Sequence, residues 1–69
     1  MTKYTIYLLE NSSVRESREV EAQSLGAALD QGLALWGHLA DSISRKTVLA
    51  ESPDGDQLSE SFGGEGSDN

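Results

Sequence analysis

Alternating apolar and polar positions at the start of the chain predict two strands joined by a tight turn. Residues 3–9 are rich in aromatic and β-branched side chains, which favour a pleated strand. Successive side chains of a strand point to opposite faces, so one face of this strand is expected to enter the core. The core-facing positions are Tyr4, Ile6 and Leu8. The opposite positions are Thr5, Tyr7 and Leu9.

Residues 10–13 form a cluster of turn-forming residues that is short enough to close a hairpin. The return strand covers residues 14–22. Glu16 and Arg18 fall among the apolar positions of this strand, which indicates a sheet edge or a bulge nearby. The apolar positions that share one face are Val14, Val20 and Ala22. The other face is polar and contains Arg15, Ser17, Glu19 and Glu21.

Apolar residues at three- and four-residue spacing over residues 24–41 predict an amphipathic helix. Ser24 is placed to act as its N-cap, because its hydroxyl can accept a hydrogen bond from a free backbone N–H. Gly32 lies within the apolar stripe, which predicts a close approach of the helix to the sheet. The stripe consists of Leu25, Ala28, Leu29, Gly32, Trp36, Leu39 and Ile43.

The remaining chain predicts a second hairpin. Residues 45–51 form a strand around Val48, and Ser52-Pro53-Asp54-Gly55 is a strong turn signal. Residues 56–62 return as a weakly alternating fourth strand anchored by Leu58 and Phe62. Residues 63–69 contain nothing to bury and are expected to form a flexible acidic tail.

The predicted fold class is α+β: a two-layer domain over residues 1–62, with an antiparallel sheet of three to four strands and one helix on one face, in the order ββαβ(β). A chain of this size has room for one core. The predicted core residues are Tyr4, Ile6, Leu8, Val20, Leu25, Leu29, Trp36, Leu39 and Val48.

The amino-acid composition excludes several kinds of site and partner. The chain has 69 residues, no Cys and one His, which excludes disulfides, thiol nucleophiles and multi-His metal sites. No apolar run approaches the roughly 20 residues that span a bilayer, so we expect a cytoplasmic protein without a membrane partner. The net charge is −7, and residues 51–69 contain six acidic residues and no basic one. This charge repels phosphates and attracts basic protein surfaces.

Candidate chemistry is sparse. His38 lies on the polar side of the predicted helix, and no base and orienting group is visible beside it. Asp54-Gly55-Asp56 lacks the remaining ligands of a calcium loop and is better interpreted as a turn. We therefore expect no enzyme activity, no cofactor and no metal.

The expected partner is a basic protein surface, bound by an acidic sheet face, by a sheet edge or through the tail. The oligomeric state stays open. An alternative is weak nucleic-acid binding, if Tyr7 stands among basic residues that meet on one side of the sheet: Lys3, Arg15, Arg18, Arg45 and Lys46. The candidate partner-binding residues are Tyr7, Glu16, Glu19, Glu21, Glu51, Asp54 and Asp56.

Two resemblances add to this interpretation. Residues 21–28, which follow two strands, together with the strand at 45–51 and the turn at 53–55, resemble the layout of small phage-encoded anti-CRISPR proteins. That resemblance implies a compact, non-enzymatic inhibitor that acts in the host cytoplasm and blocks a CRISPR effector complex by occupying its DNA- or guide-binding surface. The helix at 25–36 is similar to that of antitoxins with a partial ribonuclease-like fold, which implies neutralisation of a small basic toxin.

Overall fold

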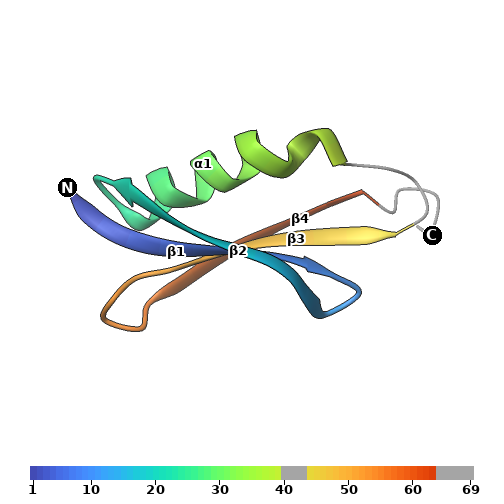
Figure 1. Cartoon of the computed structure of the whole chain (residues 1–69), viewed down its shortest axis with the longest axis horizontal. Coiled ribbons are helices and arrows are strands. Elements are labelled where there is room, and N and C mark those ends of the chain that lie inside the picture. Colours follow the sequence, from blue (N-terminus) through green and yellow to red (C-terminus); the bar gives the residue numbers. More distant parts are fainter. Residues whose placement is uncertain (40–43, 64–69) are drawn as a thin grey trace.

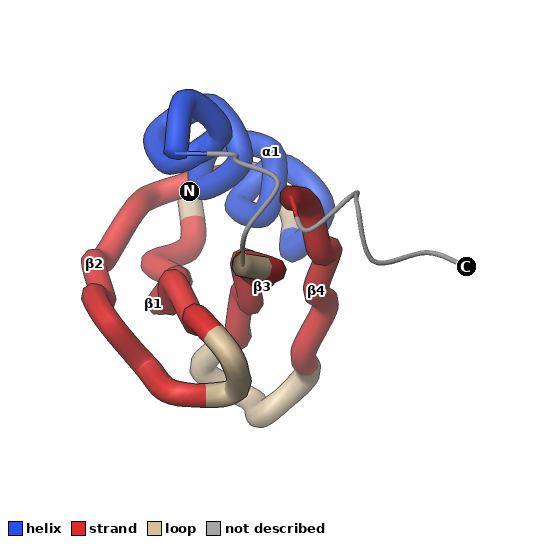
Figure 2. The backbone as a smooth tube through the Cα atoms, turned by 90° about the vertical axis from the view of Figure 1, so that its right-hand side faces the viewer, coloured by secondary structure: helices blue, strands red, loops and turns tan. Residues whose placement is uncertain are grey.

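The computed structural model describes residues 1–39 and 44–63 of the chain. Four strands form one antiparallel sheet in the order β2-β1-β3-β4, and one helix lies across one face of it (Figures 1 and 2). The predicted α+β fold is confirmed, and the fourth strand forms. The predicted tail at 63–69 lies outside the described residues except for Gly63, which ends β4. The elements are β1 (Thr2–Glu10), β2 (Ser13–Ala22), α1 (Leu25–Trp36), the 3-10 helix η1 (Gly37–Leu39), β3 (Arg45–Glu51) and β4 (Gln57–Gly63).

The first hairpin turns through two residues, Asn11 and Ser12, whose φ angles are 54° and 73°. Two consecutive positive φ values are typical of a type I′ turn, whose twist matches that of the flanking strands. The β1–β2 register then shifts: Leu9 pairs with Val14, whereas Leu8 pairs with Glu16. Arg15 is therefore an extra residue in β2 and forms a bulge.

This bulge changes which side chains share a face. The prediction that Val14 lies on the same face as Val20 and Ala22 is wrong. The extra residue reverses the alternation, so Val14 lies opposite Leu9 on the other face and is 60% exposed. The expectation of a sheet edge or a bulge near Glu16 and Arg18 is confirmed, because β2 is an edge strand and the bulge lies at Arg15.

Helix α1 begins as predicted, because the Ala27 backbone N–H donates to Ser24 Oγ at 3.1 Å. It ends earlier than the predicted residue 41. The chain tightens at Gly37 into η1, and glycine is a poor helix former that weakens continuation. The predicted helical residues 40–41 and the stripe residue Ile43 lie outside the described residues.

The core lies between α1 and the central strands β1 and β3. Gly32 faces Val48 and Ile6, and a Cβ at Gly32 would lie 2.6 Å from Val48 Cγ1, so the close approach predicted for this glycine is confirmed. Of the predicted core residues, Val20, Leu25 and Leu39 are partly buried against the core. The buried apolar residues are Tyr4, Ile6, Leu8, Ala22, Ala28, Leu29, Trp36, Val48 and Ala50.

The second hairpin closes through the predicted turn. The Gly55 N–H donates to the Ser52 carbonyl at 3.0 Å, and Gly55 has a φ of 98°, a conformation that favours glycine. The Ser52 N–H donates to the Asp56 carbonyl at 2.8 Å, which closes the loop between β3 and β4. None of the described helices has the length and apolar character needed to cross a membrane.

Candidate docking surface

The helix covers one face of the sheet, and no described element covers the other (Figure 1). Directly paired residues of neighbouring strands place their side chains on the same face, so the strand register defines this second surface. We call it the uncovered face. Its residues are Lys3, Thr5, Tyr7, Leu9, Val14, Ser17, Glu19, Glu21, Arg45, Thr47, Leu49, Glu51, Gln57, Ser59 and Ser61.

Acidic side chains occupy one end of the uncovered face. Thr5 of β1 pairs with Glu19 of β2 on one side and with Glu51 of β3 on the other. Two strand spacings separate the backbones of the two glutamates by about 10 Å. Glu21 follows on the same face of β2 and pairs with Lys3. Three strands are therefore needed to bring these groups together.

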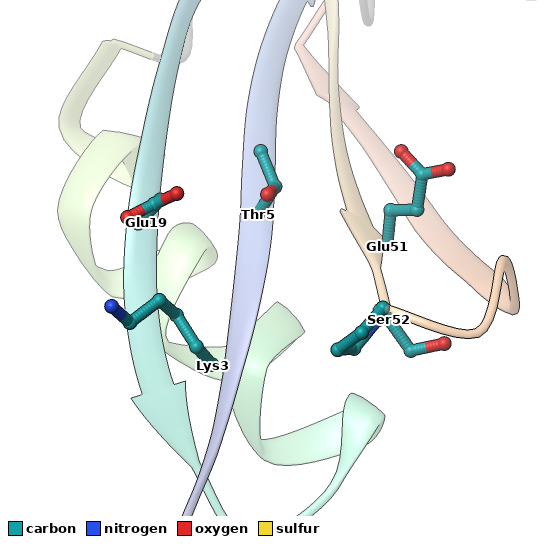
Figure 3. Close-up of a pocket in the computed structure, with 6 residues that line it drawn as sticks. Lys3, Thr5, Glu19, Glu51 and Ser52 are labelled. Carbon is teal, nitrogen blue, oxygen red and sulfur yellow. The ribbon is translucent and has the colours of Figure 1, made fainter.

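A depression of about 330 Å³ lies over this end of the sheet (Figure 3). Glu19 and Glu51 project from the strands that flank Thr5, and Lys3 lies below Thr5 in that view. The depression therefore presents two carboxylates around a threonine, beside one ammonium group. Its lining residues are Lys3, Thr5, Glu19, Glu51, Ser52 and Pro53.

Tyr7 stands in the next row of the uncovered face, between Ser17 and Leu49. Its hydroxyl donates to Glu51 Oε1 at 3.3 Å. Desolvation and the negative charge of Glu51, which also accepts this hydrogen bond, raise the pKa of Tyr7 above its ordinary value of 10.0. Tyr7 therefore stays a neutral hydrogen-bond donor at physiological pH.

The structure divides the predicted partner-binding residues into three places. Tyr7, Glu19, Glu21 and Glu51 share the uncovered face. Glu16 lies on the helix side, where its Oε1 accepts a hydrogen bond from Trp36 Nε1 at 3.3 Å. The last two, Asp54 and Asp56, belong to the loop that directly follows Glu51.

The contact residues predicted from the sequence include none of the aliphatic residues at the centre of the uncovered face. Leu49 pairs with Tyr7, and Leu9 pairs with Val14 in the following row. Alternation already placed Leu9 on this face, and the alternation around Val48 was a usable signal for Leu49, because a strand neighbour of a core residue points away from the core. Val14 carried no such signal, because the bulge decides its face.

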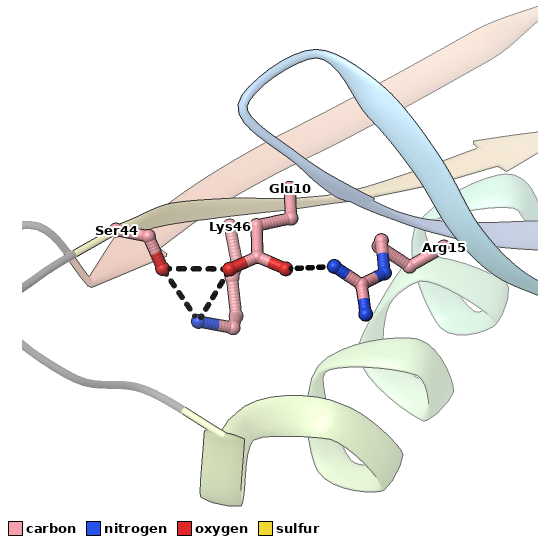
Figure 4. A network of polar contacts seen from close by, with 4 residues as sticks. All are labelled: Glu10, Arg15, Ser44 and Lys46. Atoms are coloured by element: carbon pink, nitrogen blue, oxygen red, sulfur yellow. Dashed lines mark hydrogen bonds and ion pairs between the residues drawn. The ribbon is translucent and has the colours of Figure 1, made fainter.

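A second polar cluster lies at the opposite end of β1 and centres on Glu10 (Figure 4). Glu10 Oε1 accepts from Arg15 Nη1 at 2.7 Å, and Glu10 Oε2 accepts from Ser44 Oγ at 2.9 Å. Lys46 is 7% exposed, and its Nζ lies 3.0 Å from Ser44 Oγ and 3.9 Å from Glu10 Oε2. A buried ammonium group is costly unless it has such partners. Through these contacts the cluster also connects the first hairpin to the start of β3.

The five basic residues do not meet on one surface. Lys3 and Arg45 lie toward opposite ends of the uncovered face, whereas Arg18 pairs with Ile6 on the helix side. Arg15 and Lys46 contact Glu10. The basic surface around Tyr7 that the nucleic-acid alternative requires is therefore absent from the described residues.

The single histidine and the carboxylates do not form a metal-binding cluster among the described residues. His38 is exposed in η1. Within residues 1–39 and 44–63, no three His, Cys, Asp or Glu side chains lie close enough together to hold a metal ion. Compared with protein-family models, with curated proteins and with solved structures, the chain matches none.

Proposed function

We propose that this chain is a non-enzymatic protein-binding module that docks its uncovered face on a basic surface of a partner. One observation carries the proposal: Glu19, Glu21 and Glu51 stand on a sheet face that the helix leaves open, beside Tyr7 and Leu49. Protein interfaces commonly combine an apolar or aromatic centre with a polar rim, and this face has both parts.

The apolar centre of the uncovered face would add close packing to the electrostatic attraction between the two proteins. Tyr7 buries a large ring at a small entropic loss and keeps a hydroxyl for hydrogen bonding, which is why tyrosine is common among residues that dominate binding energy. Its hydrogen bond to Glu51 holds both side chains in place before docking. A preorganised surface loses less entropy when it binds.

The charge selects the kind of partner. A net charge of −7 on 69 residues speeds the approach of basic surfaces and repels acidic ones. Extended basic surfaces occur where proteins hold the phosphate backbone of a nucleic acid. A chain docked there would compete with the nucleic acid. We therefore propose an anti-CRISPR-like inhibitor, encoded by a phage or another mobile element, that blocks a host nucleic-acid-processing complex.

Phage plating on bacteria with active CRISPR immunity tests this function. The wild-type chain, expressed in a panel of hosts that carry different CRISPR systems, should restore plaque formation on at least one of them. The variant Glu19→Gln/Glu21→Gln/Glu51→Gln should lose this effect, because it removes the carboxylate charges of the uncovered face without changing the shape of the side chains.

A control variant, Asp30→Asn/Glu65→Gln/Asp68→Asn, changes no residue of the uncovered face. It changes the net charge from −7 to −4, the same change that the triple Glu→Gln variant makes. It should inhibit immunity like the wild type. Loss of inhibition in this control would assign the effect to total charge or to the C-terminal acids. Failure of the wild type on every host of the panel would contradict the anti-CRISPR-like function.

A further inference from the structure

The two edges of the sheet differ in how well they are protected against pairing with another strand. Edge strands expose unpaired N–H and C=O groups, and natural sheets shield them with charges, bulges or prolines. Edge strand β2 has five charged residues among ten and carries the bulge at Arg15. Edge strand β4 has one charged residue among seven, no proline and an unbroken register with β3.

The side chains of β4 alternate between the two faces of the sheet in a regular pattern. On the helix side of the sheet, Leu58, Glu60 and Phe62 follow one another at every second position, opposite Ala50, Val48 and Lys46 of β3. Leu58 is 43% exposed, although it lies on the face that α1 covers elsewhere. The alternate positions, Gln57, Ser59 and Ser61, are small or polar. In the described part of the chain, β4 pairs with β3 and with no other strand.

We propose that the outer edge of β4, which pairs with no other strand among the described residues, binds an extended segment of another protein as a fifth strand, with the pattern apolar–x–Lys/Arg–x–apolar. The two apolar residues would cover Leu58 and Phe62, and the cation would lie opposite Glu60. Strand addition draws affinity from backbone hydrogen bonds and specificity from alternate side chains. The pattern is the same in both directions, so parallel and antiparallel segments present the same side chains.

A second copy of the chain fits this edge less well than a basic segment. Antiparallel self-pairing that places Leu58 opposite Phe62 of the other copy also places Glu60 opposite Glu60. Directly opposed like charges destabilise a strand pair. Each copy also carries a charge of −7, so the approach of two copies is repulsive. A cationic segment removes both obstacles.

Backbone amide chemical shifts of the full chain, labelled with ¹⁵N, test the proposal during titration with a capped peptide of sequence Thr-Val-Thr-Lys-Thr-Val-Thr. Shift changes should be contiguous over residues 57–63 and reach their β3 partners. A control peptide with Glu in place of Lys should bind about fivefold more weakly. The Glu60→Lys variant should reverse this order, whereas Glu19→Lys on β2 should keep it.

Each other outcome overturns the proposal. Chemical-shift changes centred on β2 or on the uncovered face would show that the peptide binds elsewhere than at β4. Equal affinity for both peptides would show that Glu60 does not select the cation. Changes over β4 that follow protein concentration without peptide would assign the edge to a second copy. This test does not depend on the docking function of the uncovered face, because the Glu19→Gln/Glu21→Gln/Glu51→Gln variant should bind the Lys peptide like the wild type.

Discussion

The two faces of the sheet are built from the same strands but differ in burial and in the chemistry of their side chains. Leu8 and Leu9 are adjacent in β1 and chemically identical, yet Leu8 is 4% exposed beneath the helix and Leu9 lies half-buried on the uncovered face. The helix side contains the aliphatic and aromatic core. The uncovered face contains carboxylates, hydroxyls and a small apolar centre.

This difference separates the residues that stabilise the fold from those of the proposed docking surface. Burial of apolar surface is the main favourable contribution to folding, and here it is concentrated on one face. Side chains on the other face are under little constraint from packing. A small domain with a single core can therefore dedicate a whole sheet face to recognition.

Truncation of the two leucines gives the largest expected contrast. Leu8→Ala should lower the free energy of unfolding by about 3 kcal/mol, because it removes buried methyl groups and leaves a cavity. Leu9→Ala should lower it by at most about 1 kcal/mol, since its side chain is already partly in water. Urea denaturation followed by Trp36 fluorescence measures both values. Equal losses would contradict the division between the faces.

Glycine substitutions in α1 sharpen the comparison at the helix–sheet contact. Gly32→Ala should destabilise the fold by about 1–3 kcal/mol, because the new Cβ meets Val48 and Ile6 in a filled core. Gly26→Ala is the matched control: its Cβ would have only Ser24 Oγ nearby, at 4.0 Å, and alanine favours the helix by up to about 1 kcal/mol. The midpoint temperature of thermal unfolding should fall for Gly32→Ala and rise for Gly26→Ala. A Gly32→Ala variant as stable as the wild type would show that α1 can lift from the sheet.

Charge removal from the uncovered face should have a small effect on folding. Glu19→Gln and Glu51→Gln should each change the free energy of unfolding by no more than about 0.5 kcal/mol, because both side chains lie away from the core and form no ion pair within the described residues. Urea denaturation of the single variants checks this. A loss of about 2 kcal/mol or more, which is the scale of a core substitution, would assign these residues to stability.

The smallest expected effect is at alkaline pH. The pKa of Tyr7 is raised in the folded chain, so the neutral phenol is favoured there relative to the unfolded chain. The resulting stabilisation is present below the unfolded-state pKa of about 10 and decreases as the pH rises through the higher folded-state value. Tyr7→Phe should lack this decrease. Denaturant midpoints of the wild type and the Tyr7→Phe variant, measured between about pH 8 and pH 11, test this difference. Identical pH profiles of the two proteins would contradict it.

The sequence allowed most of the fold to be predicted, because period-two alternation, the Ser24 cap and the Ser52–Gly55 turn are local signals. The bulge at Arg15 was not predictable in position, since it depends on how β2 pairs with β1. It is the reason why Val14 was placed on the wrong face. The early end of α1 depended on Gly37, whose effect a stripe of apolar residues does not reveal.

The candidate site was predictable only in part. Alternation alone places Glu19 and Glu21 on one face of β2 and Tyr7 on one face of β1. Their meeting with Glu51 requires the strand order β2-β1-β3, which no local pattern specifies. Alternation already groups Glu16 with Val20 and Ala22, and the register places it on the helix side, beside Trp36. Leu49 was accessible to the same reasoning but does not look like a contact residue until Tyr7 is placed next to it.

The most direct test of the proposed docking surface is the affinity of a purified CRISPR effector complex for three proteins over a salt series, with the complex taken from a host on which the chain restores plaque formation. The wild type and the Asp30→Asn/Glu65→Gln/Asp68→Asn control should bind with similar affinity that falls as salt rises. The Glu19→Gln/Glu21→Gln/Glu51→Gln variant should bind at least about tenfold more weakly at low salt, with a shallower salt dependence. Equal affinity of all three proteins would contradict docking through the uncovered face.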